Sequence, residues 1–368
     1  MSFHKALAGP VAAVVLLVPT ACRRHSAGTA REVTAPAPSG STVTASTTAT
    51  TASPKVSSGR LRPAPVLFGA AVLLPDEAGQ FVDVTPPHGS EEYIHDAFFV
   101  DRNHGWVGFT DSSAASGRLV RTDDGGRTWE TVAPATHRHQ SGGSRVWLFF
   151  LDRRVGWTVS YAASAPAGGI YRTLNGGGTW SDYTALPEPG PVRFTTRDHG
   201  WLAGYSVFGN TGGLYETFNG GLTWTRRSVP PPAGTAPGDL AYRLPTFDGA
   251  EGILPVSAGD DRVAFYRSSD GGRTWRPAAI RAVPGGPKVA VAVASRSVWW
   301  AVAAEGGPVS VTTDAGRTWT TRPRVGLPET IIDFEATDDR TAWASAAGNG
   351  ELRLYATSDG GATWHPVS

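Results

Sequence analysis

One phrase of nine residues recurs six times in this chain, and it restricts the possible fold more than any other feature. It reads RTDDGGRTW at 121–129, RTLNGGGTW at 172–180, ETFNGGLTW at 216–224, RSSDGGRTW at 267–275, VTTDAGRTW at 311–319 and ATSDGGATW at 356–364. The tryptophans that close the phrases stand 44 to 51 residues apart. Internal repeats of roughly 20–50 residues are typical of solenoids, propellers and arrays.

The residue types in the phrase favour a structural turn over a catalytic signature. Its acidic position alternates between acid and amide, being Asp124, Asn175, Asn219, Asp270, Asp314 and Asp359. A general acid or a nucleophile would lose its chemistry as an amide. The sixth position is always Gly, as expected where the backbone needs a positive φ or approaches another segment closely. The phrase closes on an apolar anchor, which is Trp129, Trp180, Trp224, Trp275, Trp319 or Trp364.

The residues between the phrases form short apolar or alternating runs separated by turn signals. In the second repeat these runs are RVWLFFLD, GWTVSYA, GGIYRT and WSDYTAL. A second landmark stands 23 residues before the closing Trp in three repeats, at Trp106, Trp157 and Trp201; Ile253, Trp299 (or Trp300) and Trp343 hold this place later. Four short strands in each repeat predict an all-β propeller of six four-stranded blades. Residues 66–87 resemble a hairpin that lacks the phrase. They either close the last blade with WHPVS or belong to a seventh blade.

The phrase resembles the Asp-box, or BNR repeat, of sialidase-like propellers. Together with FVDRNHGW at 99–106 and FLDRRVGW at 150–157, it resembles the photosystem II assembly and stability factor family over residues 90–368. This resemblance implies the propeller fold. It does not choose a function, because Asp-box propellers include glycosidases, sorting receptors and assembly factors.

The amino-terminal segment indicates export. Residues 1–21 have a basic start, an apolar run from Ala6 to Val18 and small residues before Cys22, which is typical of a signal peptide. Cys22 is the only cysteine, and PTAC resembles the lipobox of bacterial lipoproteins, although Pro19 replaces the usual apolar residue. An incidental cysteine is the alternative. Residues 22–65 are rich in Ser, Thr, Ala and Pro and are predicted to be a disordered tether before the propeller at 66–368. We expect a domain held at the outer face of the cell membrane, or secreted if Cys22 is not lipidated.

Charge and motif content exclude several partners and cofactors. The formal net charge is +1, without the basic stripe that nucleic-acid binding requires, and no phosphate-cradling glycine motif occurs. His137-Arg138-His139 lacks a recognisable third metal ligand. We therefore predict no nucleic-acid partner, no metal and no cofactor.

A sialidase-like glycoside hydrolase is the catalytic alternative. Its Arg-Ile-Pro motif is matched only by Arg243-Leu244-Pro245, far from the expected place before the first box. Glu91-Glu92-Tyr93 offers a tyrosine and carboxylates, but neighbours on a strand point to opposite faces. The sequence instead favours a non-catalytic scaffold that binds an envelope protein or glycan.

A candidate binding face lies at the predicted channel mouth. The innermost strands are predicted to begin with Asp96, Arg145, Arg193, Arg243, Lys288 and Asp333, which leaves one side of the channel cationic. Solvated strand ends are the structural alternative. The variable loops at 134–143 and 230–239 are expected on the same face, opposite the boxes, where loops carry function on a rigid scaffold.

Overall fold

A computed structural model describes most of the chain after residue 64. The described ranges are 65–68, 71–75, 81–90, 92–111, 117–132, 144–162, 168–181, 184–204, 212–259, 261–283, 289–303, 306–328, 330–348 and 351–367. The predicted signal peptide, Cys22 and nearly all of the predicted tether lie outside these ranges. Residues Lys55–Ser368 form one compact unit that contains every described strand.

The described residues form six blades, numbered in chain order, and neighbouring strands within each blade are antiparallel. The first contains β4 (Glu92–Phe99), β5 (Gly105–Asp111), β6 (Gly117–Thr122) and β7 (Glu130–Val132). The second contains β8 (Ser144–Phe150), β9 (Gly156–Ala162), β10 (Gly169–Thr173) and β11 (Thr184–Ala185). The third contains β12 (Val192–Phe194), β13 (Gly200–Ala203), β14 (Leu214–Thr217) and β15 (Thr225–Arg227).

The fourth blade has an additional strand. It begins with a one-turn 3₁₀ helix, η1 (Pro237–Asp239), and contains β16 (Leu240–Tyr242), β17 (Thr246–Asp248), β18 (Glu251–Ala258), β19 (Arg262–Ser268) and β20 (Arg276–Ala282). Both β16 and β17 pair with β18. The fifth contains β21 (Val289–Val293), β22 (Trp299–Ala303), β23 (Val309–Thr312) and β24 (Thr320–Arg322). The sixth contains β25 (Thr330–Ala336), β26 (Ala342–Gly348), β27 (Glu351–Thr357) and β28 (His365–Pro366).

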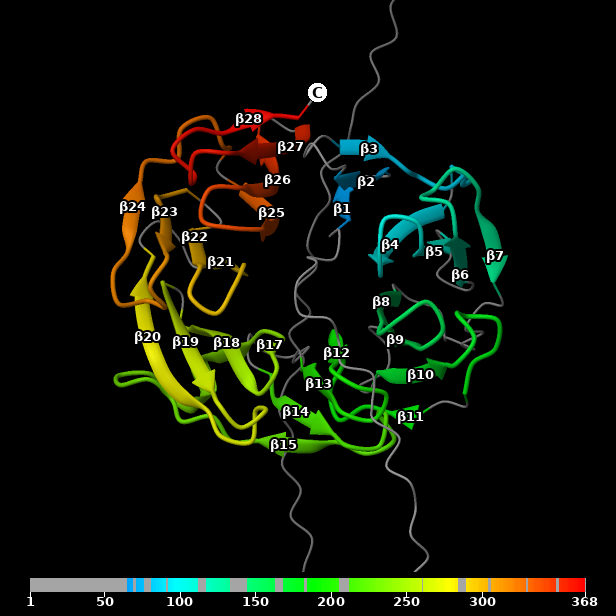
Figure 1. The fold of residues 1–368 in the computed structure, drawn as a ribbon, viewed down its shortest axis with the longest axis horizontal. Coiled ribbons are helices and arrows are strands. Elements are labelled where there is room, and N and C mark those ends of the chain that lie inside the picture. The colour runs from blue at the N-terminus through cyan, green and yellow to red at the C-terminus, as the bar shows by residue number, and fades with distance from the viewer. Residues whose placement is uncertain are drawn as a thin grey trace, which may run out of the picture. The chain divides into compact units, whose positions relative to one another are not determined.

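The hairpin that precedes the first repeat forms a separate sheet of three strands. These are β1 (Val66–Phe68), β2 (Ala71–Pro75) and β3 (Phe81–Asp83). Phe81 packs edge-on against Trp343 of the sixth blade at 5.7 Å, and Val72 joins the core of the first blade. The sheet therefore lies between the last and first blades and closes a ring of seven sheets (Figure 1). The described residues thus form the six predicted blades, and β1–β3 form a further three-stranded sheet that does not pair with β28.

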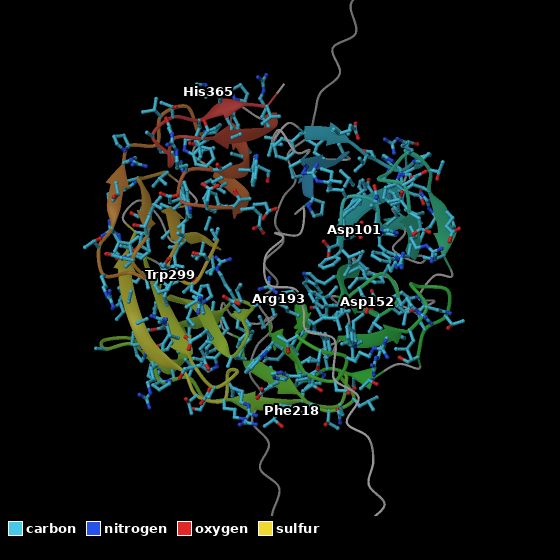
Figure 2. The ribbon with its side chains drawn as sticks, in the orientation of Figure 1. Asp101, Asp152, Arg193, Phe218, Trp299 and His365 are labelled. Atoms are coloured by element: carbon cyan, nitrogen blue, oxygen red, sulfur yellow. The ribbon has the colours of Figure 1, made fainter. Side chains whose placement is uncertain are left out.

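The first strands of the five blades other than the fourth, β4, β8, β12, β21 and β25, lie nearest the centre of the ring (Figure 1). Figure 2 places Arg193 of β12 beside this centre and Phe218, which belongs to a box turn, at the outer rim. Among the described residues, no helix has the length and apolar character needed to cross a membrane.

Stacked aromatic rings join neighbouring blades. Trp106 of the first blade stacks on Phe150 of the second at 3.6 Å, and Trp157 stacks on Phe194 of the third at the same distance. In the fifth blade Trp300 takes this place, since its Nε1 donates to the Asp338 carbonyl of the sixth blade at 2.8 Å. Trp299, the first choice from the sequence, instead faces the fourth blade. Each landmark Trp thus fastens its blade to the next one.

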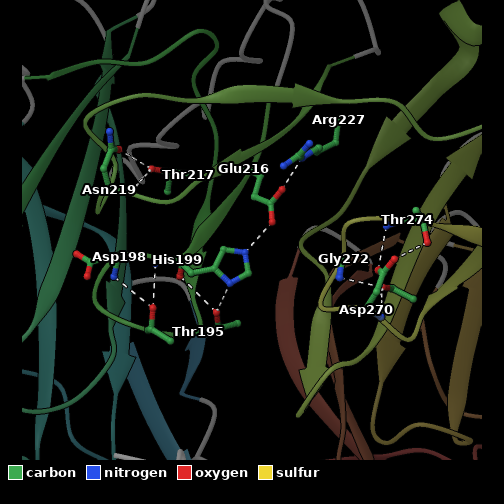
Figure 3. A network of polar contacts seen from close by, with 12 residues as sticks. Thr195, Asp198, His199, Glu216, Thr217, Asn219, Arg227, Asp270, Gly272 and Thr274 are labelled. Carbon is green, nitrogen blue, oxygen red and sulfur yellow. Dashed lines mark hydrogen bonds and ion pairs between the residues drawn. The ribbon is translucent and has the colours of Figure 1, made fainter. Parts of the chain in front are cut away.

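The repeated phrase forms a turn held by its own side chains. In the fourth blade the Ser268 hydroxyl accepts the Gly272 amide and donates to Asp270 Oδ1, both at 2.8 Å. Asp270 Oδ1 also accepts the Thr274 amide, and its Oδ2 accepts the Thr274 hydroxyl at 2.6 Å (Figure 3). These hydrogen bonds, led by that from the Thr274 hydroxyl, lower the pKa of Asp270 to about 2.

The geometry of the turn explains why Asp and Asn exchange freely. In the third blade Asn219 Oδ1 still accepts the Thr223 amide at 2.9 Å, while its Nδ2 donates to Thr223 Oγ1 at 2.8 Å. A threonine hydroxyl is both a donor and an acceptor, so the bond survives with its direction reversed. The structural interpretation of the phrase therefore has an atomic basis.

Each box turn is tied to the turn between the first and second strands of its blade. The amide of the fifth residue of the phrase donates to a carbonyl of that turn at 2.8–3.0 Å in all six blades. In the fourth blade the corresponding turn is the one between β17 and β18. Both turns consequently lie at one end of the ring, which we call the box side.

Candidate functional site

Charged side chains of the inner strands gather around the centre of the ring. They are Asp96 on β4, Arg193 on β12, Arg243 just after β16, and Asp333 and Glu335 on β25. Arg193 appears beside the centre in Figure 2. Of the other two cations predicted for this face, Arg145 lies on β8 with its side chain outside the described set, and Lys288 lies outside the described residues.

Three of these groups bind the backbone of the next blade. Arg193 Nη1 donates to the Pro245 carbonyl at 3.0 Å and to Thr246 Oγ1 at 2.8 Å. Arg243 donates to the carbonyl of Val289, and Asp96 Oδ2 accepts the Leu148 amide at 2.7 Å. An innermost strand has an edge that no other strand covers, so such bonds satisfy polar groups that would otherwise be unpaired. The predicted cations Arg193 and Arg243 therefore join adjacent blades.

The central carboxyl groups are harder to ionise than ordinary ones. Burial inside the ring, opposed by hydrogen bonds from the Leu148 and Ala97 amides, raises the pKa of Asp96 to about 7. Burial also raises the pKa of Glu335 to about 7, with a further contribution from Asp333 and an opposing one from Arg193. Burial also raises the pKa of Asp333, while the charge of Arg243 opposes this shift. Asp333 and Glu335 are nevertheless exposed to solvent on the inner strand of the sixth blade.

Among the described groups, the cations come from the third and fourth blades and the carboxyl groups from the first and sixth. The cationic side that the sequence predicts stays a prediction, since it also depends on Arg145 and Lys288. Sequence reasoning identified Asp96 and Asp333 but placed them at strand beginnings, whereas both lie within their strands beside a β-bulge. It missed Glu335. The signal was present, because residues two apart on a strand share a face and Glu335 follows Asp333 at that spacing.

The loops that the sequence assigned to the same face are only partly described. Residues 134–143 lie outside the described ranges. The 230–239 segment is held against the fourth blade, where Arg262 donates to Thr235 Oγ1 at 3.0 Å and Tyr266 donates to the Pro230 carbonyl.

The residues considered for a sialidase site do not assemble with the central groups. Glu92 forms an ion pair with Arg118 at 2.8 Å, which lowers the pKa of the carboxyl, and Tyr93 is 57% exposed. Arg243 binds a backbone carbonyl, as described above. Within the described ranges, no group of three His, Cys, Asp or Glu side chains is arranged to hold a metal ion.

Comparison with known proteins agrees with the architecture. The family profile described as "Photosynthesis system II assembly factor YCF48" matches residues 184–326, which is less than half of the chain. A solved structure, "YCF48 bound to D1 peptide", has a TM-score of 0.51 and 18% identity, and covers 84% of this chain and 88% of its own. YCF48 from Cyanidioschyzon merolae has a TM-score of 0.51 at 21% identity, covering 76% and 86%.

A curated relative has an enzymatic name. The xyloglucanase Xgh74A of Acetivibrio thermocellus is 25% identical over 279 residues, which is 68% of this chain. The match covers only 29% of the length of that enzyme. The fold and the boxes define the chain as an Asp-box (BNR) β-propeller. Within that class it resembles the photosystem II assembly factors.

Proposed function

We propose that this protein is an exported, lipid-anchored and non-catalytic scaffold whose ring centre binds a segment of another envelope protein. The observation that carries the proposal is the set of charged groups around the ring centre, of which Asp333 and Glu335 still face solvent. The rigid closed ring fixes the positions of these groups, as a binding site requires. The resemblance to YCF48, one structure of which has a bound peptide, supports a protein segment over a glycan.

The charge of the centre suggests the chemistry of the segment. Arg193 and Arg243 direct their guanidinium groups to backbone carbonyls of the next blade, whereas the pKa values of Asp333 and Glu335 are raised by burial. An opposite charge nearby favours the ionised carboxylate. A basic side chain or an amino terminus of the bound segment is therefore the group that these carboxylates would best accommodate.

Export and lipid anchoring rest on the amino-terminal sequence. The apolar run from Ala6 to Val18 is too short to span a bilayer, and Cys22 follows small residues as in a lipobox. The tether of residues 22–65 would allow the ring to stand roughly 35–40 Å from the anchor if it behaves as a flexible coil.

Partner capture from the native envelope tests the proposal. Chemical cross-linking and pull-down with the wild-type protein should recover one specific protein, and Asp333→Asn/Glu335→Gln should lose it while remaining folded. Asp339→Asn, a change in the same blade on the box side, is the matched control and should keep the partner. Charge reversal of Arg193 and Arg243 is a poorer probe, because it also removes bonds between blades. An unchanged partner after Asp333→Asn/Glu335→Gln argues against the ring centre as the binding site.

Glycoside hydrolysis is the second candidate function. The observation in its favour is that Asp96 and Glu335 have pKa values raised to about 7, as the general acid of a glycosidase requires. The similarity to a xyloglucanase points the same way. The scaffold proposal predicts no release of reducing ends from xyloglucan, sialosides or common glycosides. Robust turnover that Glu335→Gln abolishes would establish the enzyme instead.

A further inference from the structure

The boxes of the second and third blades differ from the other four at their outward positions. The third residue of the phrase is Leu174 or Phe218 in these two blades, whereas elsewhere it is Asp123, Ser269, Thr313 and Ser358. The fourth residue is Asn instead of Asp. The seventh residue is Gly178 or Leu222 in these two blades. Elsewhere it is an arginine, Arg127, Arg273 or Arg317, except in the sixth box, where it is Ala362. Two adjacent blades have thus exchanged polar turn residues for apolar ones.

Three of these side chains protrude into solvent. Leu174 is 55% exposed, Phe218 57% and Leu222 64%, although the same turns are polar in the other blades. We call these three residues the tip patch. The box turn itself does not need apolar groups here, since it closes equally well around Ser269 or Thr313. Their presence therefore calls for a role outside the turn.

The Phe218 ring is held in its outward position by a polar network. The imidazole of His199 lies parallel to the ring at 4.8 Å, and the guanidinium of Arg227 lies 5.9 Å from its centre. The side chains of His199 and Arg227 meet at Glu216, which is fully buried and accepts hydrogen bonds from His199 Nε2 at 2.7 Å and from Arg227 Nε (Figure 3). This network fixes an exposed aromatic ring that would otherwise be free to fold back onto the surface.

Exposed arginines lie in the turns that neighbour the two boxes of the tip patch. Arg153, Arg154 and Arg197 are exposed in the turns that bond directly to the two boxes, through Gly176 N to the Arg154 carbonyl and Gly220 N to the Asp198 carbonyl. These turns also hold two exposed acids: Asp152 accepts two backbone amides, and Asp198, whose side chain is 70% exposed, lies 3.9 Å from Arg172. Because both boxes have Asn in place of Asp, neither presents an exposed carboxylate.

We propose that the box side of the second and third blades docks on an anionic lipid surface. The tip patch would enter the boundary between headgroups and acyl chains, and the arginines would meet lipid phosphates, which is how basic and apolar groups divide at a membrane interface. Aromatic and arginine side chains are also enriched in protein interfaces, so a protein partner is the alternative that a failure to bind vesicles would favour. The docking is independent of the protein segment proposed for the ring centre.

Binding to lipid vesicles tests this inference. The chain from residue 55 onward, a compact unit that holds all seven sheets, removes the predicted anchor from the measurement. It should cosediment with vesicles of phosphatidylcholine and phosphatidylglycerol at low salt, and far less with phosphatidylcholine alone. High salt should weaken the binding, because exposed charges are screened.

The variants use residues that other boxes of this chain already contain. Leu174→Ser/Phe218→Ser/Leu222→Ala copies the neutral sixth box and should lower the partition coefficient about tenfold or more, given the apolar area removed from the interface. Ile280→Ser/Val325→Ser removes apolar residues that are exposed elsewhere and should leave binding unchanged. Failure of the wild-type unit to bind anionic vesicles, or equal binding by the tip-patch variant, would overturn the proposal.

Discussion

Two adjacent glycines in one box should respond very differently to a side chain. Gly271 and Gly272 have similar backbone angles, with φ of 74° and 91°. A Cβ on Gly271 would meet nothing within 4 Å, whereas one on Gly272 would lie 2.3 Å from Cζ2 of Trp201 in the preceding blade. Ala315 already occupies the place of Gly271 in the fifth blade at a φ of 60°. The backbone angle penalises both positions, but close contact with another blade penalises only Gly272.

These contacts give the expected magnitudes. Left-handed backbone costs an L-residue roughly 1–2 kcal/mol, and overpacking a buried ring costs roughly 1–3 kcal/mol more. Gly272→Val should therefore lower the free energy of unfolding by about 2–5 kcal/mol. Gly271→Ala should lower it by roughly 1 kcal/mol, because a less flexible unfolded chain offsets part of the penalty.

Thermal unfolding followed by circular dichroism measures the difference. With about 2 °C of Tm per kcal/mol for a domain of this size, Gly272→Val should lower the Tm by about 4–10 °C and Gly271→Ala by about 2 °C. Gly272→Ala separates the two contributions, since it adds the clash without a β-branch. Equal losses at Gly271 and Gly272 would refute the argument that the invariant glycine at the sixth position of the phrase is required for packing between blades.

Three further outcomes are expected. The pKa values of Asp124, Asp270 and Asp314 are lowered to about 2, so their contribution to stability is complete above about pH 4 and is lost as pH falls toward 2. A variant with all three residues changed to Asn should therefore show a shallower fall of Tm as the solution is acidified. The raised pKa of Glu335 has the opposite sign, so stability falls as pH rises from about 4 to 7, and Glu335→Gln should raise the Tm near pH 8 but not near pH 5. If Glu335→Gln lowers the Tm near pH 8, the carboxylate is stabilising as an ion and the argument from burial fails. The full-length protein should fractionate with membranes and be released by Cys22→Ala, and equal retention of both proteins would contradict lipidation.

The sequence predicted the architecture because the repeated unit reports on local geometry. A glycine at positive φ, a carboxamide or carboxylate that accepts turn amides, and a closing tryptophan each act within a few residues of one another. Their alternation and spacing therefore survive in the sequence as a readable pattern. The seventh sheet was harder to assign, since β1–β3 lack the phrase and their place depends on contacts such as Phe81 with Trp343, which are distant in sequence.

The ring centre was predicted less well for the same reason. Residue type placed Arg193 and Arg243 near the channel, but a sequence does not show that they reach Thr246 and Val289 in the following blades. The exposure of Phe218 was equally hidden, because it depends on His199 from another turn. Contacts between blades decide what each of these side chains is free to bind.

Site-specific photo-cross-linking tests the central claim, which is that the ring centre binds a protein segment. A photoreactive residue would replace Thr330, an exposed residue on the same inner strand β25 as Asp333 and Glu335, so that both carboxyl groups are kept. As a control, it would replace Thr313 in a box turn of the fifth blade, and both proteins would be irradiated in the native envelope. We predict one discrete adduct from position 330, absent from position 313, whose cross-linked peptide also binds the purified protein. No adduct at position 330, or the same adducts from both positions, would contradict the claim.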